Sequence, residues 1–283
     1  MSVFDEKENL MNTVTSKDGT RIAYDVYGSG PAIVLVDGAT ATRAFGGSTD
    51  LARTLAERGF TTYAFDRRTR GESGDTQPYA VAREIEDIEA LIDKAGGTAN
   101  LFGISSGGAL ALEAAAVLGE KVRKLAVYEV PYMGVDPDRV PSPDVFTQTK
   151  QAVQEGRNGD AFAAYMGQWI PEEMLAGMRQ APFWPMMEAV APSLVNDATV
   201  MFGRNFTPQK ELLETITMPV LALSGDVDML PGVDTSFFRK AARAIADMVP
   251  QGAYQVLPGQ NHDVKAEVIA PVLSQFYGSG GKN

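Results

Sequence analysis

Hydrophobic residues along the chain follow two alternating patterns, short apolar runs and stretches with helical spacing. A continuous run such as AIVLVDG at 32–38 predicts a strand buried on both faces. Apolar residues three and four positions apart, as at 80–97, predict an amphipathic helix, and a glycine pair ends it. The predicted strands are 20–28, 32–38, 61–68, 99–105, 122–131, 218–225 and 253–259. The predicted helices are 48–60, 80–97, 106–119, 233–249 and a last one from about residue 264.

Strands that alternate with helices predict βαβ crossovers and a doubly wound, mostly parallel sheet. This alternation stops at 132–216, where only helical fragments are recognisable, at 143–156, 160–170, 171–180 and 183–190. The sequence therefore predicts one α/β domain, formed by 1–131 and 217–278, with a helical insertion at 132–216. The Gly-rich end, 279–283, is expected to be a flexible tail.

Composition narrows the classes of function. The 283 residues include no cysteine and one histidine, which excludes disulfides, cysteine nucleophiles and metal sites built from several histidines. The net charge of -11 argues against nucleic acid or an anionic membrane as partner. The acidic N-terminus lacks the apolar stretch of a secretion signal, and no apolar run is long enough to span a membrane. We expect a cytoplasmic protein with a small-molecule substrate and no cofactor or metal. A homodimer stays an open alternative.

One short segment, GISSGG at 103–108, joins a predicted buried strand directly to a predicted helix. Gly103 and Gly107 allow the tight turn that lifts a middle residue above the sheet, which is the G-x-S-x-G pattern with Ser105 at its apex. Ser106 is the competing assignment, but it would place Ile104 where a small residue is needed. A Gly-rich phosphate loop is the other interpretation, although the lysine of such a loop is missing.

A serine hydroxyl becomes a good nucleophile when a base removes its proton, and His262 is the only histidine available as that base. It follows the last predicted strand. An acid that orients this histidine is expected after the preceding strand, where Asp226 and Asp228 are the candidates. The chain order of serine, aspartate and histidine is the one typical of this sheet topology.

These motifs together resemble the α/β-hydrolase fold family, in its branch of small esterases, lactonases and cofactor-free peroxidase-like proteins. The resemblance covers nearly the whole chain, through AIVLVDG, FDRRTRGES, GISSGG, LSGDVD and GQNHD. It implies that Asp228, three positions after Gly225, is the acid. Asp226 is the second choice, and Glu129 is a distant third, because some relatives take the acid from that earlier strand.

The resemblance also implies an oxyanion hole formed by the backbone N–H groups of Ala39 and Ser106. Asp37 stands where relatives usually carry a histidine, and we expect it either to bond Arg67 or Arg68 or to be solvated. Relatives often have glycine at Thr69, a difference with a structural consequence. The insertion lies where the family has a cap, whose apolar residues could line a substrate pocket or pack together. The candidates are Met166, Trp169, Phe183, Trp184 and Met187.

The sequence therefore predicts a serine hydrolase that cleaves carboxylic esters or lactones of small to medium apolar substrates through an acyl-enzyme. A serine at the elbow argues against the epoxide hydrolases and haloalkane dehalogenases of this fold, which use aspartate there. The same triad serves C–C bond hydrolases, perhydrolases and aminopeptidases, which stay as alternatives. A member that binds a small molecule without catalysis is an alternative of a different class.

Overall fold

The computed structural model of the protein describes residues 12–203, 205–230 and 233–278. Its centre is an eight-stranded sheet in the order β1-β2-β4-β3-β5-β6-β7-β8. β1 and β2 pair antiparallel, as do β2 and β4, and the remaining neighbours are parallel. The strands are β1 (Asn12–Thr15), β2 (Arg21–Gly28), β3 (Ala32–Val36), β4 (Thr61–Phe65), β5 (Ala99–Ile104), β6 (Val122–Tyr128), β7 (Val220–Gly225) and β8 (Gly252–Leu257).

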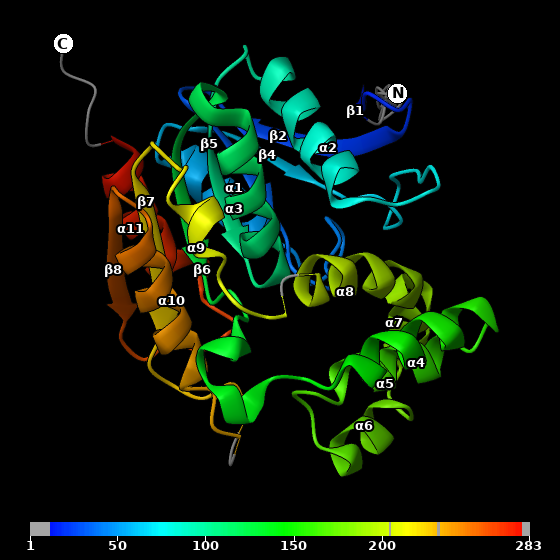
Figure 1. Ribbon diagram of the computed structural model, residues 1–283. Helices are drawn as coiled ribbons and strands as arrows, with labels where there is room; N and C mark the ends of the chain where they lie inside the picture. The colour runs from blue at the N-terminus through cyan, green and yellow to red at the C-terminus, as the bar shows by residue number, and fades with distance from the viewer. Residues whose placement is uncertain (1–11, 204, 231–232, 279–283) are drawn as a thin grey trace, which may run out of the picture.

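Helices cover both faces of this sheet, which confirms the doubly wound α/β class (Figure 1). One hydrophobic core joins the sheet to α2 (Val81–Lys94), α3 (Ser106–Leu118) and α10 (Phe237–Met248). The other core joins the opposite face to α1 (Thr49–Glu57) and α11 (Ala266–Gly278). The central strands β3 and β5 lie between the two cores, which explains why their sequences are almost continuously apolar.

The glycine pair after α2 ends this helix as its sequence predicts. The helix buries Ile85, Ile88, Leu91 and Ile92 on one face, at the spacing of an amphipathic helix. Gly96 and Gly97 then have φ values of 105° and 91°, which side chains with a Cβ rarely tolerate. The chain can thus turn directly into β5, the strand that leads to Ser105.

The residues between β6 and β7 form helices at one side of the layered part of the molecule (Figure 1). We call residues 132–216 the cap segment. Its α-helices are α4 (Pro143–Gln154), α5 (Asn158–Met166), α6 (Glu172–Met178), α7 (Trp184–Val190), α8 (Leu194–Phe202) and α9 (Lys210–Leu213). The helical fragments expected at 143–190 correspond to α4 to α7. The division into core and cap stays our proposal.

Among the strands and α-helices of the described residues, the sequence does not predict β1, α8 and α9. β1 is short and polar, and it is held by its antiparallel pairing with β2 rather than by an apolar pattern of its own. The helices α8 and α9 lie in the stretch after Val190, for which the sequence predicts no helix. The flexible tail expected at 279–283 and the N-terminal stretch without a secretion-signal pattern lie outside the described residues.

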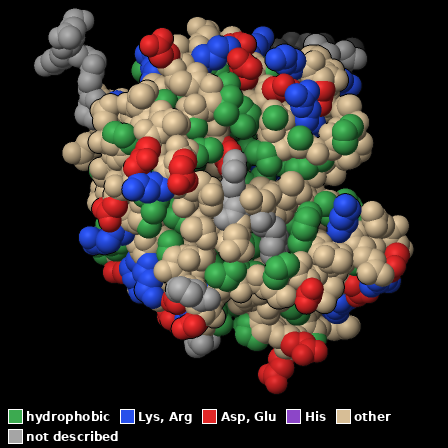
Figure 2. Space-filling view, in the orientation of Figure 1, with side chains coloured by type: hydrophobic (Ala, Val, Ile, Leu, Met, Phe, Trp, Pro, Cys, Tyr) green, Lys and Arg blue, Asp and Glu red, His purple; other side chains and the backbone are tan. Residues whose placement is uncertain are grey.

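The surface carries no obvious concentration of one charge on the face seen in Figure 2, where acidic and basic side chains are interspersed with hydrophobic ones. Within the described ranges, none of the helices is both long enough and apolar enough to cross a membrane.

Candidate active site

Ser105 occupies the sharp turn between β5 and α3. Its φ of 56° and ψ of -133° lie outside the regions that a serine normally adopts, and α3 begins at the next residue. The Ser105 N–H donates to the carbonyl of Tyr128 on the neighbouring strand, at 3.0 Å. The backbone therefore has the strained geometry of a nucleophile elbow, in which the side chain stands above the sheet edge.

The two glycines of the motif are needed because other backbone atoms approach them closely. A Cβ at Gly107 would lie 2.2 Å from the Val36 carbonyl oxygen, and one at Gly103 would lie 2.7 Å from the Gly107 carbonyl oxygen. Gly38 faces the serine itself, since a Cβ there would lie 2.8 Å from the Cβ of Ser105. These contacts bring the end of β3 against the elbow.

His262 lies in the loop between β8 and α11, and its ring is held on two sides. Its Nδ1 is 2.9 Å from Oε2 of Glu129. The ring of Phe238 from α10 stacks on the imidazole with a centroid distance of 4.8 Å and an interplanar angle of 15°. The preceding residue is fixed as well, because the Tyr128 hydroxyl donates to the Asn261 carbonyl at 2.5 Å. This arrangement leaves Nε2 as the imidazole nitrogen available to a serine hydroxyl.

Glu129 immediately follows β6 and is buried, with 3% of its surface exposed. Its Oε1 accepts a hydrogen bond from the backbone N–H of Gly225 at 2.8 Å, while its Oε2 faces the histidine. The backbone of Glu129 has a φ of 45°, an uncommon conformation for a residue with a side chain. Glu129 therefore has both the burial and the fixed orientation expected of an acid that orients a histidine.

Asp228 does not occupy this place, contrary to our prediction. Its Oδ1 accepts from the backbone N–H of Thr235 at 3.0 Å and from the Thr235 hydroxyl at 2.9 Å. Asp226 accepts from the Gly259 N–H at 2.6 Å. Both aspartates are exposed, and the contacts that they make are these hydrogen bonds within nearby loops rather than a bond to the imidazole. The earlier strand supplies the carboxylate beside His262.

The Asp37 carboxylate accepts hydrogen bonds from a neighbouring loop and not from the side chain of Arg67 or Arg68. Its carboxylate accepts from the backbone N–H of Ser48 at 2.9 Å and from the Ser48 hydroxyl at 2.5 Å. Burial raises the pKa of Asp37, although these hydrogen bonds and the nearby Arg70 and Arg67 oppose the shift. The Arg67 guanidinium does reach this residue, but it donates to the backbone carbonyl at 3.1 Å.

Thr69, which stands where relatives often have glycine, has a left-handed backbone with a φ of 70°. Its hydroxyl accepts a hydrogen bond from the Asn196 amide of α8, at 3.0 Å. The structural consequence expected at this position is therefore a contact between the loop after β4 and the cap segment.

A pocket of about 690 Å³ opens at this edge of the sheet, and Ser105 and His262 both line it. Gly38 and Ala39 from the end of β3 form another part of its wall, together with Met229 from the loop after β7. Charged residues also contribute, and they are Asp37, Asp50, Arg53, Asp263, Lys265 and Glu267. The pocket thus brings the candidate nucleophile and base together with the Ala39 backbone, in mixed polar and apolar surroundings.

The five cap residues predicted as a substrate lining are not among the residues that line this pocket. Trp184 and Met187 are buried in a separate cluster within the cap segment, and Met166 and Phe183 pack against it. The Trp169 ring lies 6.3 Å from that of Phe206 and 6.1 Å from that of Phe237, between cap and core. Their apolar character therefore serves packing of the cap, the alternative that the sequence left open.

Within the described ranges, no group of three or more His, Cys, Asp and Glu side chains is arranged to hold a metal ion. The pocket is lined by Ser105, His262 and several carboxylates, beside Arg53 and Lys265. A serine, a histidine and a carboxylate are the groups used in acyl transfer by a nucleophilic serine.

Comparison with known proteins agrees with this geometry. The model of a family described as the alpha/beta hydrolase family matches residues 33–270. The chain belongs to that family. An α/β hydrolase from Sphaerobacter thermophilus DSM 20745 is 45% identical, covering 94% of this chain and 100% of its own, with a TM-score of 0.82. No curated protein matches the sequence of this α/β hydrolase.

Two more distant structures show the same fold. The esterase from Exiguobacterium antarcticum is 19% identical, with a TM-score of 0.70, and covers 95% of this chain and 100% of its own. The enol-lactonase from Burkholderia xenovorans LB400 is 18% identical, with a TM-score of 0.67 and the same two coverages. At these identities the two structures show that this member of the alpha/beta hydrolase family shares their fold.

Proposed function

We propose that this α/β hydrolase cleaves carboxylic esters or lactones of small to medium size, with Ser105, His262 and Glu129 as its catalytic residues. The observation that carries the proposal is the contact between Glu129 and His262. A buried carboxylate lies 2.9 Å from Nδ1 of the only histidine, in a pocket that this histidine shares with a serine in a strained elbow. The distant esterase and enol-lactonase favour esters and lactones among the bonds that such a triad cleaves.

Each residue has a distinct part in the reaction. His262 Nε2 accepts the Ser105 proton as Oγ attacks the substrate carbonyl, and the carbonyl oxygen becomes an oxyanion. The N–H groups of Ala39 and Ser106 stabilise this oxyanion. The imidazolium then donates its proton to the departing alkoxide, which leaves an acyl-enzyme on Ser105. A water molecule, deprotonated by His262, attacks the acyl carbonyl. The bond to Ser105 Oγ then breaks, the imidazolium returns its proton to Oγ, and the acid is released.

Glu129 supports these steps through its fixed orientation. Its carboxylate accepts from Nδ1–H, which sets the tautomer that leaves Nε2 free to accept a proton, and its charge stabilises the imidazolium. The hydrogen bond from Gly225 prevents the carboxylate from turning away. The expectation of apolar substrates rested on cap residues that do not line the pocket, so we propose no preference for apolar acyl groups.

A panel of p-nitrophenyl esters of graded chain length, run beside lactones, tests the activity, and a fluorophosphonate tests for an activated serine. We expect turnover of an ester or lactone and covalent labelling of Ser105. Ser105→Ala should lose both, while Ser106→Ala should still be labelled, since alanine retains the backbone N–H. A folded protein that is neither labelled nor active on any substrate of the panel would contradict the proposal and favour a binding role.

A further inference from the structure

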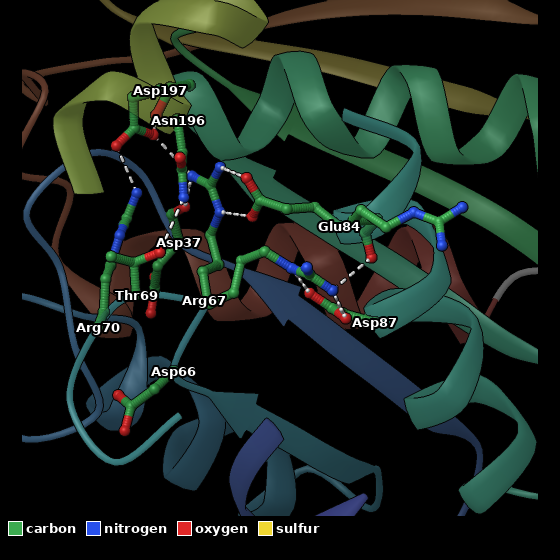
Figure 3. A network of polar contacts seen from close by, with 12 residues as sticks. Asp37, Asp66, Arg67, Thr69, Arg70, Glu84, Asp87, Asn196 and Asp197 are labelled. Atoms are coloured by element: carbon green, nitrogen blue, oxygen red, sulfur yellow. Dashed lines mark hydrogen bonds and ion pairs between the residues drawn. The ribbon is translucent and has the colours of Figure 1, made fainter. Parts of the chain in front are cut away.

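A carboxylate from the cap segment is completely buried against the loop after β4. Asp197, on α8, has 0% of its surface exposed. It lies between two buried arginines of the loop after β4, with Oδ1 2.8 Å from Nη1 of Arg67 and Oδ2 2.5 Å from Nη2 of Arg70 (Figure 3). Burying such charges is costly unless they are paired. A residue of the cap is thus tied firmly to the hydrolase core.

The two arginines extend from this carboxylate to the loop after β3. Nη1 of Arg67 donates to the carbonyl oxygen of Asp37 at 3.1 Å, and Nη1 of Arg70 donates to the carbonyl oxygen of Gly38. The Gly38 carbonyl belongs to the same peptide group as the Ala39 N–H, and in a trans peptide the two point in opposite directions. A hydrogen bond that holds the carbonyl on one side therefore orients the N–H toward the other side.

The second oxyanion donor is connected to the same carboxylate. The Ser106 hydroxyl donates to Oδ1 of Asp197 at 2.8 Å, and Ser106 is almost fully buried. Its own backbone N–H is the other group that we assign to the oxyanion hole. One cap carboxylate therefore contacts the side chain of one donor residue, and acts on the peptide of the other through Arg70.

We propose that Asp197 is a positioning residue, contributed by the cap, that fixes both backbone donors of the oxyanion hole through Arg70 and Ser106. The inference rests on the proposed function, which supplies the reaction in which these donors act. Asp197 touches neither substrate nor the reacting atoms. Its effect is to hold the two N–H groups in place before the oxyanion forms, and such preorganisation is what makes the donors effective.

The charges of the network stabilise the contact between Asp197 and the two arginines. Burial alone would raise the pKa of Asp197, but Arg70, Arg67 and the hydrogen bond from Ser106 outweigh it and lower that pKa. Arg67 is also clamped by both oxygens of Glu84, at 2.6 and 2.8 Å. The network therefore favours the charged form of Asp197, which lies between two arginines that are themselves buried.

Asp197→Asn is the direct test, and Asp87→Asn is its matched control. An asparagine has one oxygen and one amide nitrogen, so it cannot accept from both arginines at once. Asp87, also shown in Figure 3, is equally buried and pairs with a buried arginine, Arg68, at 2.7 Å. The Arg68 guanidinium bonds Asp18 and the Arg83 carbonyl instead of the loop after β3. Both variants weaken a buried ion pair, and only one of them weakens the support of the oxyanion hole.

We expect Asp197→Asn to lower kcat by about 10–100-fold. This decrease is no larger than the decrease caused by removing a whole oxyanion donor. KM should stay within about threefold of wild type, because ground-state binding does not depend on these donors. A boronic acid that forms a tetrahedral adduct with Ser105 should bind more weakly by the same factor as kcat/KM falls. Asp87→Asn should lose thermal stability while it keeps wild-type kcat and boronate affinity.

Arg70→Lys supplies a second variant with the cap carboxylate intact. A single ammonium group cannot reproduce the two-pronged contact with Gly38 and Asp197, so we expect a fall in kcat of about tenfold, again with little change in KM. This variant decides the question even if Asp197→Asn does not fold.

Three results would overturn the inference. Wild-type kcat in folded Asp197→Asn or Arg70→Lys would show that the donors need no support from the network. Equal losses of kcat in Asp197→Asn and Asp87→Asn would show a general effect of instability. A wild-type protein that shows neither turnover nor labelling would refute the proposed function itself, whereas the first two results leave that function standing.

Discussion

The replacement Glu129→Gln tests the identity of the acid most sharply, because it preserves shape and changes only hydrogen-bonding capacity and charge. If the amide oxygen keeps the bond from Gly225, the amide NH2 faces Nδ1 of His262. The imidazole then carries its proton on Nε2, where it cannot accept the serine proton. If the amide turns around, two N–H donors meet in a buried site near Gly225. The first orientation prevents His262 from accepting the serine proton, and the second is disfavoured because it leaves two buried donors without an acceptor.

The expected loss can be worked out from these contacts. A hydrogen bond to a charged group contributes roughly 1.5–3 kcal/mol, so losing it as the imidazolium forms lowers the rate by about 10–10²-fold. The wrong tautomer adds to this loss, and the corresponding change in a serine protease lowers kcat by about 10⁴. We therefore expect kcat to fall by about 10³–10⁴ in Glu129→Gln, which corresponds to about 4–5.5 kcal/mol.

Asp228→Asn is the control for this experiment. Its remaining amide oxygen can still accept from Thr235, so kcat should stay within about tenfold of wild type. The assay is steady-state hydrolysis of the best ester or lactone, with near-UV circular dichroism to confirm that each variant is folded. A larger loss in Asp228→Asn than in Glu129→Gln would refute the assignment of Glu129. Wild-type activity in Glu129→Gln would refute it as well.

Three further predictions concern the base, a buried carboxylate and the elbow. His262→Ala should lose nearly all turnover of the best ester or lactone, because it removes the base that takes the Ser105 proton; turnover at the wild-type rate in the folded variant would exclude this base. Burial raises the pKa of Asp37 in the folded protein above the ordinary 3.8. The contribution of Asp37 to folding stability is therefore complete below pH 3.8 and is lost as the pH rises through the raised pKa of the folded state. Chemical denaturation at several pH values should therefore show that wild type loses stability relative to Asp37→Asn as pH increases, and a constant difference would contradict the sign. Gly107→Ala would place a Cβ 2.2 Å from the Val36 carbonyl oxygen, so we expect its free energy of unfolding, measured by thermal denaturation, to fall by about 1–3 kcal/mol or more. Gly177→Ala is the control, because a Cβ there meets nothing within 4 Å and stability should change little.

Much of the fold follows from periodicity alone. The apolar runs of β3 and β5 predict strands buried on both faces, and the spacing in α2 predicts the helix that packs on one of them. The elbow can be predicted in the same way, because Gly103, Ser105 and Gly107 form the G-x-S-x-G pattern within five consecutive positions of the chain. Local chemistry of this kind depends on neighbours in the chain, which a sequence displays directly. The family match confirms the hydrolase fold that these motifs predict.

The partner of His262 could be decided only by the tertiary structure. Glu129 follows β6, and Asp226 and Asp228 follow β7, and these strands are parallel neighbours whose ends lie at the same edge of the sheet. Spacing along the chain cannot distinguish carboxylates that the sheet brings to one place. The direction of each loop beyond the strand does so, and it turns Glu129 inward and Asp228 toward Thr235.

The role of the apolar residues in the cap segment could also be decided only by the tertiary structure. Apolar residues such as Trp184 and Met187 are equally suited to lining a pocket and to packing helices together, and their burial among cap helices is a long-range property. The contact of Asp197 with Arg67 and Arg70 joins residues more than a hundred positions apart. The sequence determines which side chains can carry charge or bury apolar surface, because that is a property of each residue. Only the folded chain determines which of them meet, because that depends on how strands and helices far apart in the chain pack together.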